Sequence, residues 1–356
     1  MSPVAHALAA RGLRPCIVLT GQQALDPGGF GLEPFAQLRL GCPGQENPHL
    51  HVRAVAEALR PLLRHPPDLL MVQGDTSSAL GGALAGFGAG VAVAHVEAGL
   101  RTHDPALPWP EEEYRTAIDA EADLLFAPTE LAAANLHAEK VCGEIHVTGN
   151  SGIDALLSAE AELPPHTLYD GGLKRVLVTC HRRESWGEGL HSIAAAIVEL
   201  AGRGGAQIDV ILHPNQHVAG TMRRLLCGVP NVVLLEPCGY RELLQHVRDC
   251  DVVLSDSGGI QEEAPALGTP LLVLRDRTER PEGIACGNAR LVGTDTGTIV
   301  AEAHRLLNDP RAWAAMAKRA LPYGDGRAAP RIAAIVGEWL SARAPLPAEQ
   351  LAASRN

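Results

Sequence analysis

Several carboxylates in the first half of this 356-residue chain occupy positions suited to proton transfer. Asp75 and Glu97 each follow a short apolar run that reads as a buried strand, and Glu111 lies in Pro108-Trp-Pro-Glu-Glu112. The carboxyl edge of a parallel sheet is where α/β enzymes place acid–base chemistry. Most loop carboxylates instead cap helices or face solvent, and Pro-Glu-Glu-Glu is typical of a helix start. Position therefore favours chemistry most clearly for Asp75 and Glu97.

A glycine turn in the second half is suited to binding a phosphate. The segment Leu254-Ser-Asp-Ser-Gly-Gly-Ile-Gln-Glu-Glu263 reads as a strand end, a turn and a helix start. The N–H groups of a helix start attract anions, and Gly258 and Gly259 would let a ligand approach the backbone. Ser257 adds a hydroxyl donor, and the last two glutamates of the segment can accept from sugar hydroxyls. The alternative is a tight structural turn in an α/β domain.

Two further segments place cations after predicted strands. His181-Arg-Arg-Glu-Ser185 sets two arginines beside a histidine, which suits a phosphate or a departing diphosphate and proton transfer near neutral pH. A charged loop from Arg275 to Glu282 is the second candidate for holding a ligand. A surface salt-bridge cluster and a solvated loop are the respective alternatives. His213, in His-Pro-Asn, can be read simply as a strand end.

The elements that would position these residues alternate between strands and helices, which predicts parallel βαβ units and an α/β fold. We expect two doubly wound Rossmann-like domains facing a cleft, over residues 1–165 and 166–332, and a helix over 333–350 that packs back on the first domain. A helix is expected over 3–12 and a mobile loop over Gly21 to Glu46. The expected strands span residues 15–20, 69–73, 91–96, 124–127, 145–150, 175–180, 208–213, 231–235, 251–254 and 270–274.

Composition excludes several classes of protein. A content of 46% hydrophobic and 20% charged residues is ordinary for a globular chain, and a net charge of −11 argues against a nucleic-acid partner. No segment has the apolar density of a membrane span, and the first residues lack a secretory signal, so we expect a cytoplasmic protein with no membrane contact. The eight scattered cysteines show no zinc-ligand spacing, which predicts reduced thiols and no metal.

Eight short motifs occur in order along the chain, and the resemblance that they carry extends from residue 3 to about residue 335. They are Gly74-Asp-Thr76, His95-Val-Glu-Ala-Gly-Leu-Arg-Thr102, Pro108-Trp-Pro-Glu-Glu112, Val147-Thr-Gly-Asn150, His181-Arg-Arg-Glu-Ser185, Asp256-Ser-Gly-Gly-Ile-Gln-Glu-Glu-Ala-Pro265, Arg280-Pro-Glu282 and Pro322-Tyr-Gly-Asp-Gly326. Together they resemble the non-hydrolysing UDP-N-acetylglucosamine 2-epimerases. The resemblance implies a glycosyltransferase-B-like fold, a homodimer, no cofactor, and interconversion of UDP-N-acetylglucosamine (UDP-GlcNAc) and UDP-N-acetylmannosamine (UDP-ManNAc).

The resemblance also implies roles for individual residues. The family's reaction eliminates UDP to 2-acetamidoglucal and adds it back, so it needs acid–base groups at the sugar and stabilisation of the leaving diphosphate. Asp75, Glu97 and Glu111 would be the acid–base set, and His181 would complete the catalytic group at the diphosphate. Contacts to the UDP-sugar would come from Arg115, Arg182, Ser257, Gly258, Gly259, Glu263 and Arg280. A remnant of a regulatory UDP-GlcNAc site would comprise Gln22, Gln23 and His213.

The chain departs from the family's pattern near its start. The family opens with a strand and a Gly-Thr-Arg-Pro-Glu loop, and Met1 falls just after the corresponding position. The family's Gln-His-Arg-Glu segment, which touches the regulatory UDP-GlcNAc in bacterial members, is altered to Gln22-Gln-Ala-Leu25. We therefore expect the first domain to lack its first strand. Epimerase activity is expected for a form that has this strand and loop, and weak or absent activity without them.

Other functions remain open at the level of sequence. Hydrolysing relatives release UDP and free ManNAc, but the segments Glu97-Ala-Gly-Leu-Arg101 and Trp109-Pro-Glu-Glu112 resemble the non-hydrolysing branch more closely. A glycosyltransferase of the same fold would not need this set of carboxylates. A catalytically impaired UDP-sugar-binding homologue or dimer partner is the alternative outside the enzymes.

Overall fold

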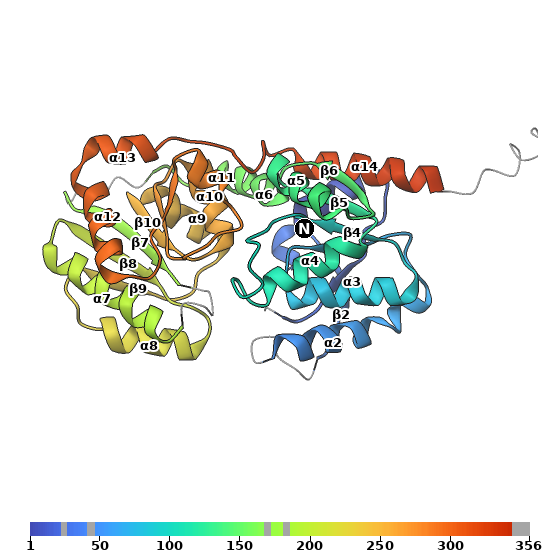
Figure 1. The fold of residues 1–356 in the computed structure, drawn as a ribbon, viewed down its shortest axis with the longest axis horizontal. Helices are drawn as coiled ribbons and strands as arrows, with labels where there is room; N and C mark the ends of the chain where they lie inside the picture. The colour runs from blue at the N-terminus through green and yellow to red at the C-terminus, as the bar shows by residue number, and fades with distance from the viewer. Residues whose placement is uncertain (23–26, 41–46, 167–171, 181–185, 344–356) are drawn as a thin grey trace, which may run out of the picture.

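The protein folds into two halves, each built on a parallel sheet with helices on its faces (Figure 1). The computed structural model describes residues 1–22, 27–40, 47–166, 172–180 and 186–343. Every strand pair formed by these residues is parallel, which confirms the α/β fold predicted from the alternation of strands and helices.

The strands of the described residues form three sheets. They are β1 (Ile17–Leu19), β2 (Pro34–Gln37), β3 (Leu70–Gln73), β4 (Val93–Val96), β5 (Leu124–Ala127), β6 (Glu144–Val147), β7 (Lys174–Thr179), β8 (Ala206–Ile211), β9 (Val232–Leu235), β10 (Val252–Ser255), β11 (Leu271–Val273) and β12 (Ala289–Leu291). The N-terminal half has a sheet in the order β3-β4-β5-β6 and a separate pair, β1-β2. The C-terminal half has the order β12-β11-β10-β7-β8-β9.

Helices connect the strands and cover the sheets. They are α1 (Ser2–Ala10), η1 (Pro27–Phe30), α2 (Pro48–Leu59), η2 (Leu62–Arg64), α3 (Ser77–Ala89), α4 (Glu111–Glu121), α5 (Glu130–Glu139), α6 (Ser151–Glu160), α7 (Glu188–Arg203), α8 (Gln216–Leu226), α9 (Tyr240–Asp249), α10 (Gly258–Leu267), α11 (Glu282–Ala285), α12 (Thr296–Asn308), α13 (Pro310–Met316) and α14 (Ala328–Arg343). Among the described residues, none of them combines the length and apolarity needed to cross a bilayer.

The central strands of both sheets are buried on both faces. Every residue of β4, β5 and β10 is buried, as expected for strands that helices cover from two sides. Their side chains are almost all apolar, with His95 in β4 and Ser255 in β10 as polar exceptions. Because burying a polar group costs free energy unless it is hydrogen-bonded, we expect both side chains to have hydrogen-bond partners, which are described below.

Strand register brings the turns after neighbouring strands to a common edge. Gln73 at the end of β3 lies beside Val96 at the end of β4, and Ser255 of β10 lies beside Thr179 of β7. The residues that follow these strands therefore gather at the carboxyl edges of the two sheets, where α/β proteins bind ligands.

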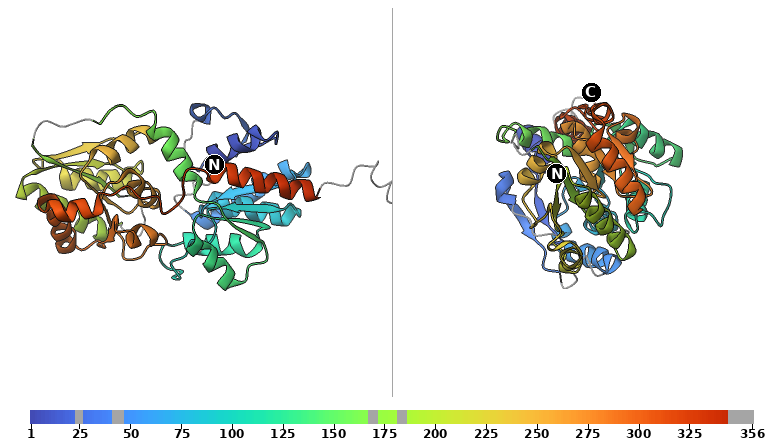
Figure 2. Two further views of the ribbon diagram at one scale, coloured as in Figure 1. Left: turned by 90° about the horizontal axis from the view of Figure 1, so that it is seen from above. Right: turned by 90° about the vertical axis from the view of Figure 1, so that its left-hand side faces the viewer.

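The C-terminal helix α14 returns to the N-terminal half, where it packs beside α1 (Figure 2). Ile332 and Val336 of α14 share a buried cluster with Val4 and Leu8 of α1. Backbone N–H groups at its first residues donate to the Asp154 carboxylate, which caps the helix. The expected helix over 333–350 thus begins earlier, at Ala328, and residues 344–350 lie outside the described part of the chain.

The expected mobile loop from Gly21 to Glu46 contains regular structure, so its prediction as a loop is wrong in part. Its described residues include η1 and β2, and β2 pairs in parallel with β1. The sequence does not predict β2, because this strand begins at a proline and is largely exposed and so lacks the pattern of a buried strand. Strand β12 was missed as well, since a three-residue edge strand with an exposed central arginine gives almost no periodic signal.

Candidate active site

Two carboxylates of the N-terminal half lie on adjacent turns. Asp75 follows β3, and Glu97 follows β4. Gln73 Nε2 lies 3.4 Å from Glu97 Oε2, and Glu97 has φ of +69°, an uncommon left-handed backbone for a residue with a side chain. A left-handed non-glycine residue is a sign of a backbone held in place by its surroundings, and such residues concentrate at functional sites.

Helix α4 supplies a cation to this edge. Its Arg115 side chain is almost fully buried and forms an ion pair with the Asp75 carboxylate. Arg115 also lies 3.2 Å from Glu112, and Glu112 accepts hydrogen bonds from the backbone N–H groups of Thr102 and His103. Glu112 therefore anchors the preceding loop and the arginine. Glu111, the first residue of α4, is half-buried at the start of the same helix.

The C-terminal half presents a different surface at the end of β10. The Ser257 backbone N–H donates to Ser255 Oγ at 3.0 Å, and Ser255 Oγ is 2.7 Å from Thr179 Oγ1 of β7. Ser257 is the N-cap of α10, but its side chain makes no capping hydrogen bond. The first N–H groups of α10 thus lack the side-chain acceptor that usually occupies them, which is the arrangement that receives phosphates at helix N-termini.

Space is available above this turn. A Cβ placed on Gly259 would have as its nearest neighbours Glu263 Oε1 at 3.9 Å and Ser257 Oγ at 4.0 Å. Neither the backbone angle nor packing against the described residues therefore requires glycine at this position. A ligand that approaches the backbone from outside would account for a glycine here. Glu263 accepts from the Tyr240 hydroxyl at 3.0 Å.

Arg280 connects the two halves. Its Nε donates to Glu262 Oε1 at 2.7 Å, its Nη1 donates to Glu279, and its Nη2 donates to Glu97 Oε1 at 2.5 Å. Glu262 also accepts from Asn150 Nδ2 at 2.7 Å, so a second polar contact crosses between the halves. Arg280, a predicted contact to the UDP-sugar, is thus directed at carboxylates, one of which is the predicted acid–base residue Glu97.

Burial shifts the pKa values of two glutamates in α10. Burial raises the pKa of Glu262 to about 8, with the neighbouring Glu97 and Glu263 carboxylates adding to the rise and Arg280 opposing it. Burial also raises the pKa of Glu263 to about 7, against the effect of its hydrogen bond from Tyr240. The region where the halves meet therefore contains carboxyl groups that can hold or release a proton near neutral pH.

The remaining predicted residues are dispersed or lie outside the described part of the chain. His181, Arg182 and Gln23 belong to segments whose structure is not described. Gln22 accepts from the Ser78 hydroxyl at 2.5 Å at the start of α3, and His213 accepts from Asn215 N at 2.9 Å after β8. The first contact joins the segment after β1 to α3, and the second holds a local turn in the other half. Asn150 was identified only as part of a family motif and Tyr240 not at all, although each lies at the start of a helix.

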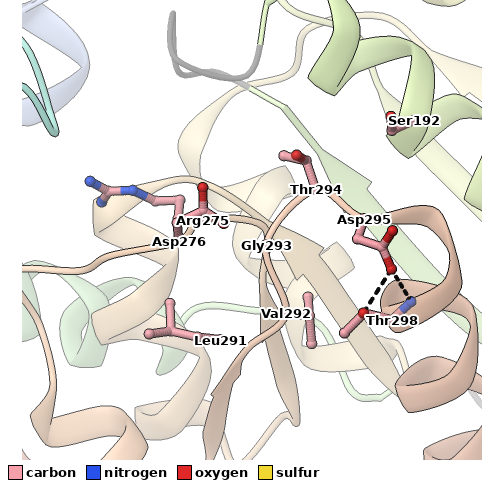
Figure 3. Close-up of a pocket in the computed structure, with 9 residues that line it drawn as sticks. All are labelled: Ser192, Arg275, Asp276, Leu291, Val292, Gly293, Thr294, Asp295 and Thr298. Carbon is pink, nitrogen blue, oxygen red and sulfur yellow. Dashed lines mark hydrogen bonds between the residues drawn. The ribbon is translucent and has the colours of Figure 1, made fainter.

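A surface pocket of about 470 Å³ lies in the C-terminal half, near the ends of β11 and β12 (Figure 3). Its lining comes from α7, the ends of β11 and β12 and the start of α12: Ser192, Arg275, Asp276, Leu291, Val292, Gly293, Thr294, Asp295 and Thr298. Asp295 accepts from the backbone N–H and the hydroxyl of Thr298, so it caps α12. The Asp295 and Thr298 side chains thus stabilise the start of α12. The described residues contain no cluster of His, Cys, Asp or Glu that could hold a metal ion.

Comparisons with known proteins agree with this arrangement. The family model described as UDP-N-acetylglucosamine 2-epimerase matches residues 6–337. UDP-N-acetylglucosamine 2-epimerases of Salmonella typhimurium and Escherichia coli K12 are each 40% identical to the chain over 351 residues, covering 93% of both partners. A crystal structure of UDP-GlcNAc 2-epimerase from Neisseria meningitidis bound to UDP-GlcNAc superposes with a TM-score of 0.89 at 34% identity, covering 95% of this chain and 96% of that one. On these grounds the chain belongs to the UDP-N-acetylglucosamine 2-epimerase family.

Proposed function

We propose that this protein interconverts UDP-GlcNAc and UDP-ManNAc by eliminating UDP from the sugar and adding it back. The observation that carries the proposal is the 2.5 Å contact between Glu97 and Arg280. It joins the carboxylate edge of one half to the loop beside the glycine turn of the other. A nucleotide held at that turn would therefore have its sugar directed toward the carboxylates, in a protein whose relatives are named for this reaction.

The reaction conserves atoms in both directions. A base takes the proton from C2, its electron pair forms a C1–C2 double bond, and the C1–O bond breaks so that UDP leaves with the electrons. Return of a proton to the opposite face of C2 and re-formation of the C1–O bond give the epimer through 2-acetamidoglucal. Each direction needs a proton acceptor and a proton donor at the sugar and stabilisation of the diphosphate.

The carboxylates of the N-terminal half would perform the proton transfers. We assign this role to Asp75, Glu97 and Glu111, with His181 at the leaving diphosphate. The ion pair with Arg115 holds the Asp75 carboxylate in place, so Arg115 would act on the substrate through that carboxylate. Arg280 would hold the Glu97 carboxylate in the same way.

The C-terminal half would hold the nucleotide. The turn at Ser257, Gly258 and Gly259 offers backbone donors for the diphosphate, and Glu263 is an acceptor for ribose hydroxyls. Arg182 would add a cation. We further propose a cytoplasmic homodimer that uses no cofactor or metal and binds neither nucleic acid nor membrane, with Gln22, Gln23 and His213 as the remnant of a regulatory site.

Isotope exchange tests the proposal. The protein is used as the cell makes it, with any residues that precede Met1. It is incubated with UDP-GlcNAc in heavy water, and the reaction is followed by proton NMR. We expect deuterium at C2 of both epimers together with UDP-ManNAc. Absence of both would contradict the proposal. Free ManNAc and UDP as sole products would identify a hydrolysing enzyme, and tight UDP binding without turnover would identify a binding protein.

A further inference from the structure

A fully buried histidine lies beneath the two carboxylate turns. His95 of β4 is 0% exposed, and its Nδ1 lies 2.6 Å from Asp119 Oδ1 of α4. Its Nε2 lies 2.9 Å from the carbonyl oxygen of Gly74, the residue before Asp75. An imidazole in the middle of an apolar strand costs free energy unless both nitrogens are satisfied, and here both have partners.

Those partners determine where the protons are. A backbone carbonyl only accepts, so Nε2 of His95 must donate to Gly74. Asp119 lies 2.8 Å from Arg101 Nη1 and accepts from the Gly99 N–H at 3.0 Å, and both contacts favour its ionised form, to which Nδ1 of His95 donates as well. In that form of the pair His95 is an imidazolium.

Charge balance supports the same protonation state. Arg101 pairs with both Asp119 and Glu139, so two cations face two anions only when His95 is charged. Burial lowers the pKa of His95, but the Asp119 carboxylate, the Gly74 carbonyl and the Glu97 carboxylate together outweigh burial, and the pKa lies above its usual value. Burial raises the pKa of Asp119, but His95 and Arg101 outweigh it and leave that pKa below its usual value.

The pair of His95 and Asp119 is bonded to both carboxylate turns. His95 holds Gly74, which precedes Asp75, and Asp119 holds the N–H of Gly99, two residues after Glu97. Gly99 has φ of +83°, and a Cβ there would lie 2.2 Å from the Ala132 carbonyl oxygen. Only glycine therefore fits at this position of the turn.

Helix α4 provides the support from one face. Arg115 and Asp119 are four residues apart, so they project from the same side of the helix. Arg115 pairs with the Asp75 carboxylate itself, whereas Asp119 and His95 fix the backbone on either side of the site.

We propose that His95 and Asp119 are positioning residues for the epimerase reaction, which hold the Asp75 and Glu97 turns at a fixed separation. The proposal rests on the proposed function, because it concerns the geometry of that reaction. A buried ion pair is often no more stabilising than apolar residues of equal volume, so one that terminates on two catalytic turns is better explained by geometry than by stability. Removing it is expected to slow the chemical step and to spare UDP binding in the other half.

The test compares Asp119→Asn and His95→Gln with a matched control, Asp209→Asn. Asp209 forms a buried ion pair with Arg175 between β7 and β8, so the control also loses a buried pair but has no contact with the carboxylate turns. We expect kcat to fall about 10- to 100-fold in the first two variants, with KM and UDP affinity nearly unchanged, because small displacements of reacting groups are costly. The control should lose thermal stability and keep kcat within about twofold.

The outcomes separate this inference from the proposed function. If the wild-type protein shows no C2 exchange, the proposed function fails. If the wild type exchanges and a folded Asp119→Asn variant matches its kcat, the positioning role is overturned. NMR of [15N]histidine-labelled wild type tests the geometry even where the variants do not fold: we expect a slowly exchanging ring with both nitrogens protonated at about pH 8. A His95 ring with one protonated nitrogen would overturn the proposal.

Discussion

The carboxyl edges of the two sheets are built on opposite plans. At the β3–β4 edge, charged side chains are paired: half-buried Asp75 with buried Arg115, and buried His95 with buried Asp119. At the β10 edge, the Ser257–Gly259 turn presents backbone N–H groups, and a Cβ on Gly259 would meet nothing closer than 3.9 Å. One edge consists of paired ionisable side chains, and the other consists mainly of backbone N–H groups at a helix start.

This contrast suggests a division of labour. Acid–base groups must be held at fixed distances from the reacting carbon, which dense ion pairing achieves. A diphosphate is bound well by backbone donors and a helix start, which need few side chains. Arg280 links the two edges because it contacts Glu97 from one half and Glu262 from the other.

The largest effect is expected for Glu97→Gln. The change keeps size and removes the ability to exchange a proton, so kcat should fall about 10³-fold if Glu97 transfers a proton at the sugar. C2 deuterium exchange measures the loss. Glu113→Gln in the first turn of α4 is the control, since that side chain is exposed, and its exchange rate should equal that of the wild type. Equal rates in wild type and Glu97→Gln would remove Glu97 from the chemistry.

A smaller effect is expected for Gly259→Ala at the other edge. The new methyl group fits the free protein, so folding should be unaffected, but it would occupy the approach of the diphosphate. We expect UDP affinity to weaken about 10-fold, with kcat at saturation changed by less than about threefold. Calorimetric titration with UDP measures the first quantity. Unchanged affinity would show that the nucleotide does not approach the turn at this residue.

The smallest effect is expected for Glu262→Gln, where the two edges meet. The pKa of Glu262 is raised to about 8 in the folded protein from an ordinary 4.5. Between these values the folded state binds more protons than the unfolded state, so this group's contribution to stability is present at low pH and is lost as pH rises.

Urea unfolding at about pH 5 and about pH 8.5 measures that contribution. The wild type should lose more stability across this range than Glu262→Gln, in which position 262 cannot titrate. Parallel pH dependence in the two proteins would show that Glu262 is ionised throughout and that its hydrogen bonds to Arg280 and Asn150 dominate over burial.

Some of this arrangement follows from sequence because parallel strands have a fixed polarity. Asp75, Glu97 and Ser257 were identified as site candidates since each follows a strand, and register alone then places them at sheet edges. The contact of Arg280 with Glu97 could not be foreseen, because it depends on how two halves far apart in sequence meet. Asp119 belongs to none of the sequence motifs, and only the packing of α4 against β4 reveals it as a partner of His95. Strand β2 lacked any burial pattern to detect.

The division of labour is tested most directly by Asp75→Asn. Two quantities are measured on the same preparation: C2 deuterium exchange in UDP-GlcNAc and the dissociation constant of UDP. We predict that exchange falls at least about 100-fold while the dissociation constant stays within about threefold of wild type. Exchange at the wild-type rate, or a loss of UDP binding that parallels the loss of exchange, would contradict the separation of chemistry from nucleotide binding.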